Sequence, residues 1–410
     1  MRILIVNHYA GSLSHGMEYR PYYFAQEWIR RGHEIDIIAA DFSHLRKENP
    51  HVTHNFQQED IDGIRYHWIR TIQYQGNGLR RAVTMFQFTA KLWLRAKKIA
   101  KMLQPDVVIA SSTYPLDTYP ARKIARYSHA KEIHEVHDMW PATLIELGGM
   151  SPKHPFVRIL QRAENTAYKK SDAVVSLLPC AKEYMVRHGL DPKKFHYIPN
   201  GIVLSDWEKP EPLPPEHMKI LQKLKNDNKV IVCYFGGFAL SNNLDLILDT
   251  AALLKLNEKI VFCLVGKGTE KERLINRKMA EHLDNVFFLP PVNKRTIPLL
   301  LSQIDIICIC SKKSPLYKYG VSMNKVYDAM MSRRPIVSAF EVPNDDIKTC
   351  GCGISVPADD PQAFAEAIAD MSNLSQEMRD AMGDLGYQTV IKNYDYNKLS
   401  EKFLDVVSGL

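Results

Sequence analysis

Short apolar runs alternate with longer stretches in which apolar residues recur every three or four positions along nearly the whole chain. The short runs, rich in Val and Ile, predict strands, and the longer stretches predict helices. We expect two series of strands, at 2–7, 34–39, 64–69, 107–111, 131–137 and 173–178 with 197–198 beside the junction, and then at 230–235, 260–265, 286–289, 304–309, 335–338 and 353–356. Because strands separated by helices form parallel sheets, the pattern predicts an α/β protein of two doubly wound, Rossmann-like domains.

A turn and a proline-rich stretch separate the two series of strands. Pro199-Asn200-Gly201 follows the first series, and the sequence EKPEPLPPE comes next, at 208–216. This composition is typical of a linker. We therefore expect an N-terminal domain over 1–200 and a C-terminal domain from 201 onward. Ligands of doubly wound sheets bind beyond the carboxyl ends of the strands, which predicts a site in a cleft where the two domains face each other.

The stretch 314–340 carries the clearest chemistry. It begins as a loop, takes on a helical pattern over 324–332 and ends in a short apolar strand after Pro335. At the start of that helix the backbone N–H groups would be unpaired, at Val321, Ser322 and Asn324. Together with the ammonium group of Lys325 they predict a seat for a diphosphate.

Asp328 lies one helical turn beyond this seat. A carboxylate there is well placed to accept hydrogen bonds from the vicinal hydroxyls of a ribose, each contributing on the order of 1–3 kcal/mol. The segment therefore predicts a nucleotide-sugar pocket. The alternative interpretation is an ordinary loop and helix whose Lys and Asp are solvated.

The same segment resembles the C-terminal signature of glycosyltransferase family 4, which comprises retaining enzymes of the GT-B fold. The family pattern is an acidic residue, seven other residues and a second acidic residue. Asp328 matches the second position, whereas Gly320 occupies the first, so the family's sugar contact at that position is missing here. The sequence Tyr-Gly-Val-Ser-Met-Asn-Lys at 319–325 is similar to a branch that builds bacterial O-antigens and capsules and includes enzymes similar to L-fucosamine transferases.

Other parts of the C-terminal half resemble family motifs in the same order. Two predicted strands are each followed by a pair of glycines, in Tyr234-Phe-Gly-Gly-Phe238 and Val265-Gly-Lys-Gly268. The next predicted strand is followed by a pair of prolines, in Phe288-Leu-Pro-Pro-Val292. The resemblance implies that the diphosphate lies on Gly236 and Gly237, that Gly266 and Lys267 line the donor site, and that the base lies near Pro290, Pro291 and Val292. Asn242 and Asn243 stand where the family often has a basic residue.

The resemblance also implies an overall function. The C-terminal domain, 201–387, would bind a nucleotide sugar, expected to be a UDP-sugar with an N-acetylated deoxy-sugar as one candidate, and no metal or other cofactor would be required. The N-terminal domain would bind the acceptor, a saccharide expected to be linked to undecaprenyl diphosphate. A last helix, at about 388–410, would cross back onto the N-terminal domain.

The loop after the first strand contains Gly11, Ser12 and Gly16 and resembles the first loop of the family. We expect its glycines to let the backbone approach the acceptor or the sugar closely. A plain turn between strand and helix is the alternative interpretation. The absence of a G-x-G-x-x-G sequence in this loop argues against a dinucleotide cofactor.

His137 lies where the predicted strand 131–137 ends, and Glu135 shares its face of the sheet. His134 points to the opposite face, so the two histidines are not expected to share a metal. His137 matches the histidine that family 4 enzymes carry near the reacting sugar, which makes Glu135, His137 and Asp138 the candidate catalytic group. A buried structural histidine is the alternative.

The sequence Asp60-Ile-Asp62 resembles a metal-binding D-x-D motif, but it precedes Gly63 and an alternating strand pattern. We therefore predict a hairpin turn at Asp62-Gly63 and no metal site.

The stretch 79–103 contains seven basic residues and no acidic one, interleaved with Phe86, Phe88 and Trp93. A basic helix with aromatic residues can lie on an anionic membrane surface. The alternative is that the helix buries its apolar face against its own sheet.

Composition and charge narrow the class of protein. The chain has 410 residues, of which 45% are hydrophobic and 24% charged, as in a soluble globular protein. The net charge of +7 is concentrated in residues 1–200, with 28 Lys and Arg against 19 Asp and Glu. No apolar run is long enough to span a membrane, and the N-terminal run predicts a strand rather than a signal peptide. We expect a cytoplasmic protein, peripheral at the inner face of the plasma membrane, with no nucleic-acid partner and with seven free thiols.

The resemblance, which covers nearly the whole chain, implies a glycosyltransferase. Two alternatives remain. The first is an epimerase or phosphorylase with a similar cleft, for which the discriminating observation is consumption of the UDP-sugar without an acceptor. The second is a non-catalytic scaffold of a polysaccharide assembly, which the missing acidic residue at Gly320 suggests.

Overall fold

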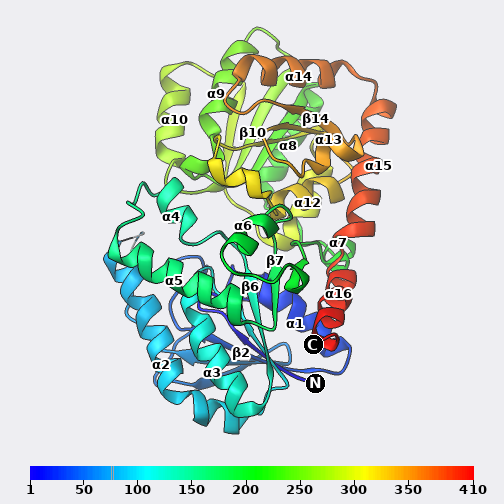
Figure 1. The fold of residues 1–410 in the computed structure, drawn as a ribbon. Helices are drawn as coiled ribbons and strands as arrows, with labels where there is room; N and C mark the ends of the chain where they lie inside the picture. Colours follow the sequence, from blue (N-terminus) through cyan, green and yellow to red (C-terminus); the bar gives the residue numbers. More distant parts are fainter. Residues whose placement is uncertain (75, 77) are drawn as a thin grey trace. The chain divides into compact units, whose positions relative to one another are not determined.

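The structure, a computed structural model, describes residues 1–74, 76 and 78–410. It divides into two compact units (Figure 1). The first unit contains Met1–Asn200, Tyr319–Ser322 and Tyr396–Leu410, and the second contains Gly201–Lys318 and Met323–Asp395. The main division falls after Asn200, in the predicted turn. The assignment of Tyr319–Ser322 to the first unit was not expected from the sequence.

The first unit is built on an eight-stranded sheet in the order β3-β4-β2-β1-β5-β6-β7-β8. Every strand is parallel to its neighbour except the edge strand β3. Its strands are β1 (Arg2–Val6), β2 (Glu34–Ala40), β3 (Gln57–Ile61), β4 (Ile64–Ile69), β5 (Val107–Ala110), β6 (Lys131–Val136), β7 (Ala173–Ser176) and β8 (Phe195–Tyr197). Its helices are α1 (Arg20–Arg30), α2 (Leu79–Leu103), α3 (Thr118–Ser128), α4 (Ala142–Glu146), α5 (Pro155–Lys170), α6 (Lys182–Arg187) and α16 (Tyr396–Ser408), with short 3₁₀ turns η1 (Pro115–Asp117) and η2 (Pro192–Lys194).

The predicted hairpin at Asp62-Gly63 is confirmed. Both residues have positive φ, 55° and 83°, as a two-residue turn between antiparallel strands requires. The hydroxyl of Tyr22 donates to Asp62 Oδ2 over 2.6 Å and holds the turn. Strand β3 was not predicted as a strand, because the sequence QQEDI at this sheet edge has one apolar residue.

The second unit contains a six-stranded parallel sheet in the order β11-β10-β9-β12-β13-β14. Its strands are β9 (Val230–Gly237), β10 (Ile260–Lys267), β11 (Val286–Leu289), β12 (Ile306–Cys310), β13 (Ile336–Ala339) and β14 (Gly353–Val356). Its helices are α7 (Leu204–Glu208), α8 (Pro215–Asn226), α9 (Leu244–Leu253), α10 (Lys271–Ala280), α11 (Ile297–Ser302), α12 (Asn324–Met331), α13 (Asp346–Cys350), α14 (Pro361–Asn373) and α15 (Gln376–Asn393), with 3₁₀ turns η3 (Leu240–Asn242) and η4 (Lys294–Thr296). A further 3₁₀ turn, η5 (Pro315–Tyr319), precedes α12.

Both sheets have the doubly wound order in which the chain reverses its direction of travel across the sheet at one place. That place lies between β1 and β5 in the first unit and between β9 and β12 in the second. Parallel sheets with this order bind ligands outside the carboxyl ends of the strands at the reversal point. The predicted pair of Rossmann-like domains is therefore confirmed, and each sheet defines where its site should lie.

Helix α2 has the predicted bounds, Leu79–Leu103, and buries one face. Phe88, Leu92 and Ile99 pack with the sheet and α3 in one core cluster of the first unit. Met85 packs in another cluster, with Tyr114 and Leu160. None of the helices formed by the described residues has both the length and the apolar character needed to cross a bilayer.

The C-terminal end of the chain differs from the prediction. The sequence predicted one helix from about 388, but the structure has two, α15 and α16, with a break before Tyr396. The break has a physical cause: the ring of Tyr394 lies 4.5 Å from that of Tyr327, and its hydroxyl donates to Asp346 over 2.7 Å. Helix α15 belongs to the second unit, and only α16 packs with the first, where Phe403 contacts Phe24 and Trp28.

Candidate functional site

At the reversal point of the second sheet, Lys325 lies beside the glycine turn that ends β9. Lys325 of α12 donates to Asn242 Oδ1 over 2.6 Å and to the hydroxyl of Tyr234 over 3.2 Å. Asn242 and Tyr234 in turn each donate to the carbonyl oxygen of Gly237 over 2.8 Å. One set of hydrogen bonds therefore fixes both the lysine and the turn that ends β9.

The charge of Lys325 has no counter-charge within the second unit. Its contacts are a phenol, an amide and the ring of Tyr234, whose centroid lies 4.9 Å from Nζ. Among the side chains that the structure describes, no carboxylate forms an ion pair with it. Burial lowers the pKa of Lys325 to about 8. A cation that is desolvated and unpaired gains most by binding an anion.

Gly236 and Gly237 leave open space next to this lysine. Both are exposed, whereas β9 is otherwise largely buried. Gly236 has φ +137°, and a side chain at Gly237 would meet only the amide nitrogen of Asn242, at 3.8 Å. These two glycines fit the predicted role of admitting a phosphate close to the backbone.

Gly266 has a structural requirement that the sequence did not reveal. A Cβ atom there would lie 1.9 Å from the carbonyl oxygen of Gly236, so Gly266 is required for the packing of β10 against β9. Lys267, the last residue of β10, is exposed. The sequence therefore identified this glycine motif, and for Gly266 the need for a glycine comes from packing within the sheet.

The four residues predicted for the diphosphate seat are not all assigned to the same unit. Asn324 and Lys325 begin α12 in the second unit, whereas Val321 and Ser322 belong to the first. Ser322 is already engaged there: its hydroxyl accepts from the backbone N–H of Asn200 over 2.8 Å, and its carbonyl oxygen accepts from the Asn200 side chain over 2.9 Å.

Asp328 is buried one turn along α12, and a lysine meets its carboxylate. The Nζ atom of Lys294, in η4, lies 2.6 Å from Oδ1 and 2.5 Å from Oδ2. The sequence did not reveal Lys294, because the two residues are 34 positions apart. Lys294 follows the segment predicted to lie against the base, in which Pro291 is exposed and the carbonyl oxygen of Pro290 accepts from His217 over 2.9 Å.

In the first unit, His137 and Glu135 form the predicted pair at the carboxyl end of β6. His137 Nε2 lies 3.2 Å from Glu135 Oε2, and the hydroxyl of Ser111, after β5, lies 3.0 Å from the same nitrogen. Ser111 also donates to Glu135 Oε2 over 2.5 Å. The imidazole side chain is 7% exposed.

Arg20, which the sequence did not single out, supports this pair from the other side. Its Nε donates to Glu135 Oε1 over 2.9 Å, and its two terminal nitrogens donate to the carbonyl oxygens of Pro199 and Ile198 over 2.5 and 2.8 Å. Arg20 is 1% exposed. The buried charge of Glu135 is thus paired on both oxygens, which a buried carboxylate needs.

The charges of this cluster shift its proton equilibria. Burial alone would raise the pKa of Glu135, but the charge of Arg20 and hydrogen bonds from His137 and Ser111 hold it well below its usual range. Burial alone would lower the pKa of His137, but the hydrogen bond and charge of Glu135 outweigh it and raise the pKa. The pair therefore favours an imidazolium next to a carboxylate.

Two neighbours of His137 lie apart from this pair. His134 points to the other face of the sheet, where its ring lies 6.0 Å from that of Tyr168. Asp138, the third predicted catalytic residue, follows the strand at an exposed position.

The loop with Gly11, Ser12 and Gly16 folds onto itself. Ser12 N donates to the carbonyl oxygen of Gly16 over 3.1 Å, and a Cβ atom at Gly11 would lie 1.9 Å from that same oxygen. Ser12 is fully buried, and its hydroxyl lies 3.0 Å from His15 Nδ1. These glycines are needed for the packing of the loop itself, and their predicted approach to a ligand stays a prediction.

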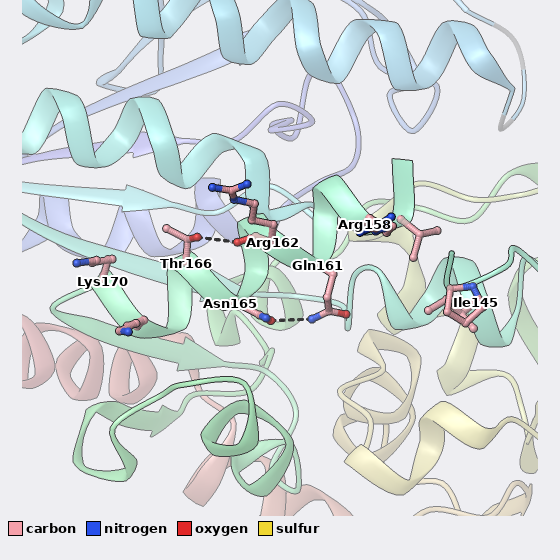
Figure 2. A pocket seen from close by; sticks show the side chains of 10 residues that line it. Ile145, Arg158, Gln161, Arg162, Asn165, Thr166 and Lys170 are labelled. Atoms are coloured by element: carbon pink, nitrogen blue, oxygen red, sulfur yellow. Dashed lines mark hydrogen bonds between the residues drawn. The ribbon is translucent and has the colours of Figure 1, made fainter. Parts of the chain in front are cut away.

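A cavity of about 510 Å³ lies along α5 in the first unit (Figure 2). Four basic side chains line it, and none of them forms an ion pair with a carboxylate among the described residues: Arg158, Arg162, Lys169 and Lys170. Gln161 and Asn165, joined by a hydrogen bond of 2.8 Å in Figure 2, line it as well. None of the residues predicted for the site lines this cavity, which we call the α5 groove.

Comparisons with known proteins agree with this architecture. Residues 14–206 match the family described as "Glycosyltransferase Family 4", and residues 218–389 match the family described as "Glycosyl transferases group 1". The chain is 23% identical to "Probable glycosyltransferase WbjE" of Pseudomonas aeruginosa, over 100% of this chain and 98% of that protein. It is 21% identical to WcaI of Escherichia coli, named as a colanic acid biosynthesis glycosyl transferase, over 70% of this chain and 71% of that one.

A solved structure shares the fold across the whole chain. HepE of Anabaena, solved in complex with UDP, superposes with a TM-score of 0.69 at 15% identity and covers 100% of both chains. The family matches cover most of both units, so the scaffold alternative is set aside. The chain belongs to glycosyltransferase family 4 and is a glycosyltransferase of the GT-B fold.

Proposed function

We propose that the enzyme transfers a sugar from a UDP-sugar donor, with an N-acetylated deoxy-sugar as one candidate, to a saccharide acceptor in surface polysaccharide synthesis, with retention of anomeric configuration. One observation carries the donor site: Lys325 is a partly buried cation with no carboxylate partner among the described residues, next to an open glycine turn at the reversal point of the second sheet. A UDP-bound relative of the same fold and the names of WbjE and WcaI support the donor class and the pathway.

The donor site would act by stabilising the negative charge of the departing diphosphate. The departing diphosphate gains negative charge as the glycosidic bond breaks, and groups that are already oriented toward it lower the barrier. Lys325 and the N-terminus of α12 would supply that stabilisation, with Asp328 on the ribose and Pro290 to Val292 against the base. In this mechanism the protein cation takes the role that a metal ion has elsewhere, so we propose that transfer is independent of metal.

His137 would act at the sugar rather than at the diphosphate. An imidazolium held by Glu135 and Ser111 can donate a hydrogen bond to a sugar hydroxyl and fix the sugar for attack. In a front-face mechanism the acceptor hydroxyl attacks the anomeric carbon on the side from which the diphosphate leaves. The acceptor's proton then passes to the departing phosphate oxygen.

Two surfaces of the first unit support an anionic, lipid-linked acceptor at the inner face of the plasma membrane. Helix α2 exposes Leu94 (81%) and Trp93 (43%) next to Arg95, Lys97 and Lys98. The α5 groove adds four basic side chains that form no ion pair with the described carboxylates. Apolar and basic groups together suit an acyl or isoprenyl chain and its phosphates.

Calorimetric titration of UDP, GDP, ADP and dTDP, each with and without EDTA, tests the donor proposal. We expect UDP to bind more tightly than the other nucleotides and to bind equally well in EDTA. Equal binding of all four nucleotides would contradict the donor class, and binding abolished by EDTA would contradict metal independence.

A further inference from the structure

Lys294 and Asp328 form an ion pair in the proposed nucleotide site. One ammonium group lies within 2.6 Å of both carboxylate oxygens. The Asp328 side chain is 7% exposed and that of Lys294 is 22% exposed, so solvent can reach the pair mainly from the lysine side. Among the described residues, no other side chain donates a hydrogen bond to this carboxylate.

The position of Asp328 creates an electrostatic conflict. Asp328 and Lys325 are three residues apart in α12 and therefore lie on the same face of the helix. If Lys325 contacts a diphosphate, the carboxylate of Asp328 adds a negative charge next to the same anion. In a partly desolvated site, repulsion between like charges is much stronger than in water.

Lys294 removes this repulsion and leaves the Asp328 oxygen atoms in place as hydrogen-bond acceptors. The ion pair has no net charge, so it does not repel a diphosphate. A carboxylate has about four lone-pair positions, and one ammonium group that touches both oxygens leaves about two of them. These positions remain available to the two hydroxyls of a ribose.

We propose that Lys294 is a positioning residue for the donor: it orients Asp328 toward the ribose and cancels its charge, so that the ribose and the diphosphate can bind together. This inference rests on the proposed function, because it assumes that Asp328 meets the ribose. It adds a residue that makes the ribose contact compatible with an anionic donor.

Titration of UDP and of 2′-deoxyuridine diphosphate tests the proposal on the full-length protein. Four variants are compared with the unaltered chain: Lys294→Met, Lys294→Arg, Asp328→Asn and the double variant Lys294→Met/Asp328→Asn. Lys223→Met, on an exposed position of α8, is the matched control. Thermal melting of each variant shows that it is folded.

We expect Lys294→Met to weaken both nucleotides by tenfold or more, because an unpaired carboxylate then faces the diphosphate. Asp328→Asn should abolish the preference for UDP over the 2′-deoxy nucleotide. The double variant should bind more tightly than Lys294→Met while still lacking that preference. Lys294→Arg should stay within about threefold of the unaltered chain. Because a purely structural ion pair would also be rescued in its stability by the double variant, the melting temperatures show whether the rescue is one of UDP affinity or only of folding.

The outcomes separate this inference from the function on which it rests. If the unaltered chain bound no UDP, the donor site itself would be wrong. If Asp328→Asn kept its preference for ribose, the ribose contact of Asp328 would be wrong, and either result would overturn the inference. If Asp328→Asn lost the preference but Lys294→Met bound UDP as tightly as the unaltered chain, only the role of Lys294 would be overturned.

Discussion

His137 Nε2 lies 3.2 Å from Oε2 of Glu135, and the same carboxylate receives Arg20 on its other oxygen. The arrangement fixes the orientation of the imidazole and favours its charged form. It also places the ring at the end of β6, beside the reversal point of the sheet.

We predict that His137→Ala lowers kcat roughly a hundredfold, within the range that a positioned donor group contributes to catalysis, with little change in UDP affinity. Initial rates of UDP release measure kcat, and calorimetry measures affinity. His134→Ala is the matched control, because His134 is similarly buried but points to the opposite face of β6. A His137→Ala enzyme as fast as the control would remove the histidine from catalysis.

Binding of UDP should weaken as the pH rises above about 8. Burial lowers the pKa of Lys325 from 10.5 to about 8, so the free enzyme loses this positive charge as the pH rises through that value. A bound diphosphate would raise the pKa again, so binding takes up a proton, and affinity falls by at most about tenfold per pH unit.

Titrations between pH 7 and pH 10, in buffers of different ionisation enthalpy, measure both the affinity and the proton uptake. The Lys325→Arg variant keeps its charge over this range and should show a nearly flat profile. A steep profile in that variant would place the titrating group elsewhere.

Alanine substitutions at two glycines of neighbouring strands should affect different properties, stability at Gly266 and UDP binding at Gly237. Gly266→Ala places a Cβ atom against the carbonyl oxygen of Gly236 and should lower the free energy of unfolding by about 3 kcal/mol or more. Gly237→Ala meets no atom closer than 3.8 Å, so it should leave stability within about 1 kcal/mol but weaken UDP binding. Urea denaturation and calorimetry measure the two effects, and the opposite assignment would contradict the proposed phosphate position.

Helix α2 should carry the protein onto anionic vesicles. Changing Arg95, Lys97, Lys98 and Lys101, all exposed, to Glu should abolish flotation with phosphatidylglycerol vesicles. A second variant with Arg158 and Arg162 changed to Ser tests the contribution of the α5 groove. Equal flotation of the α2 variant and the unaltered chain would support the interpretation that α2 serves only to pack against its sheet.

The sequence predicted the strands, the bounds of α2 and the places of Lys325 and Asp328 well, because these depend on local periodicity and on turn residues. It did not reveal Arg20 or Lys294, since each acts through a partner far along the chain: 115 residues separate Arg20 from Glu135, and 34 separate Lys294 from Asp328. Local patterns contain no information about which buried charges will pair.

The role of individual glycines was also hidden from the sequence. Gly11, Gly16 and Gly266 were identified as important, but a sequence does not distinguish a glycine that admits a ligand from one that admits a neighbouring backbone. The break between α15 and α16 falls at Tyr394, whose ring packs against that of Tyr327, and no glycine or proline at this position announces it in the sequence.

The packing of α16 on α1 has a consequence for biosynthesis. A nascent chain that has reached Asn200 has made the whole eight-stranded sheet, but Phe24 and Trp28 still lack Phe403. At translation rates of 5–20 residues per second, the ribosome needs roughly another 10 to 40 s to reach α16. Synthesis of the first unit therefore begins first, but its packing is completed last. The apolar face of α1 stays exposed to chaperones until the second unit has been synthesised.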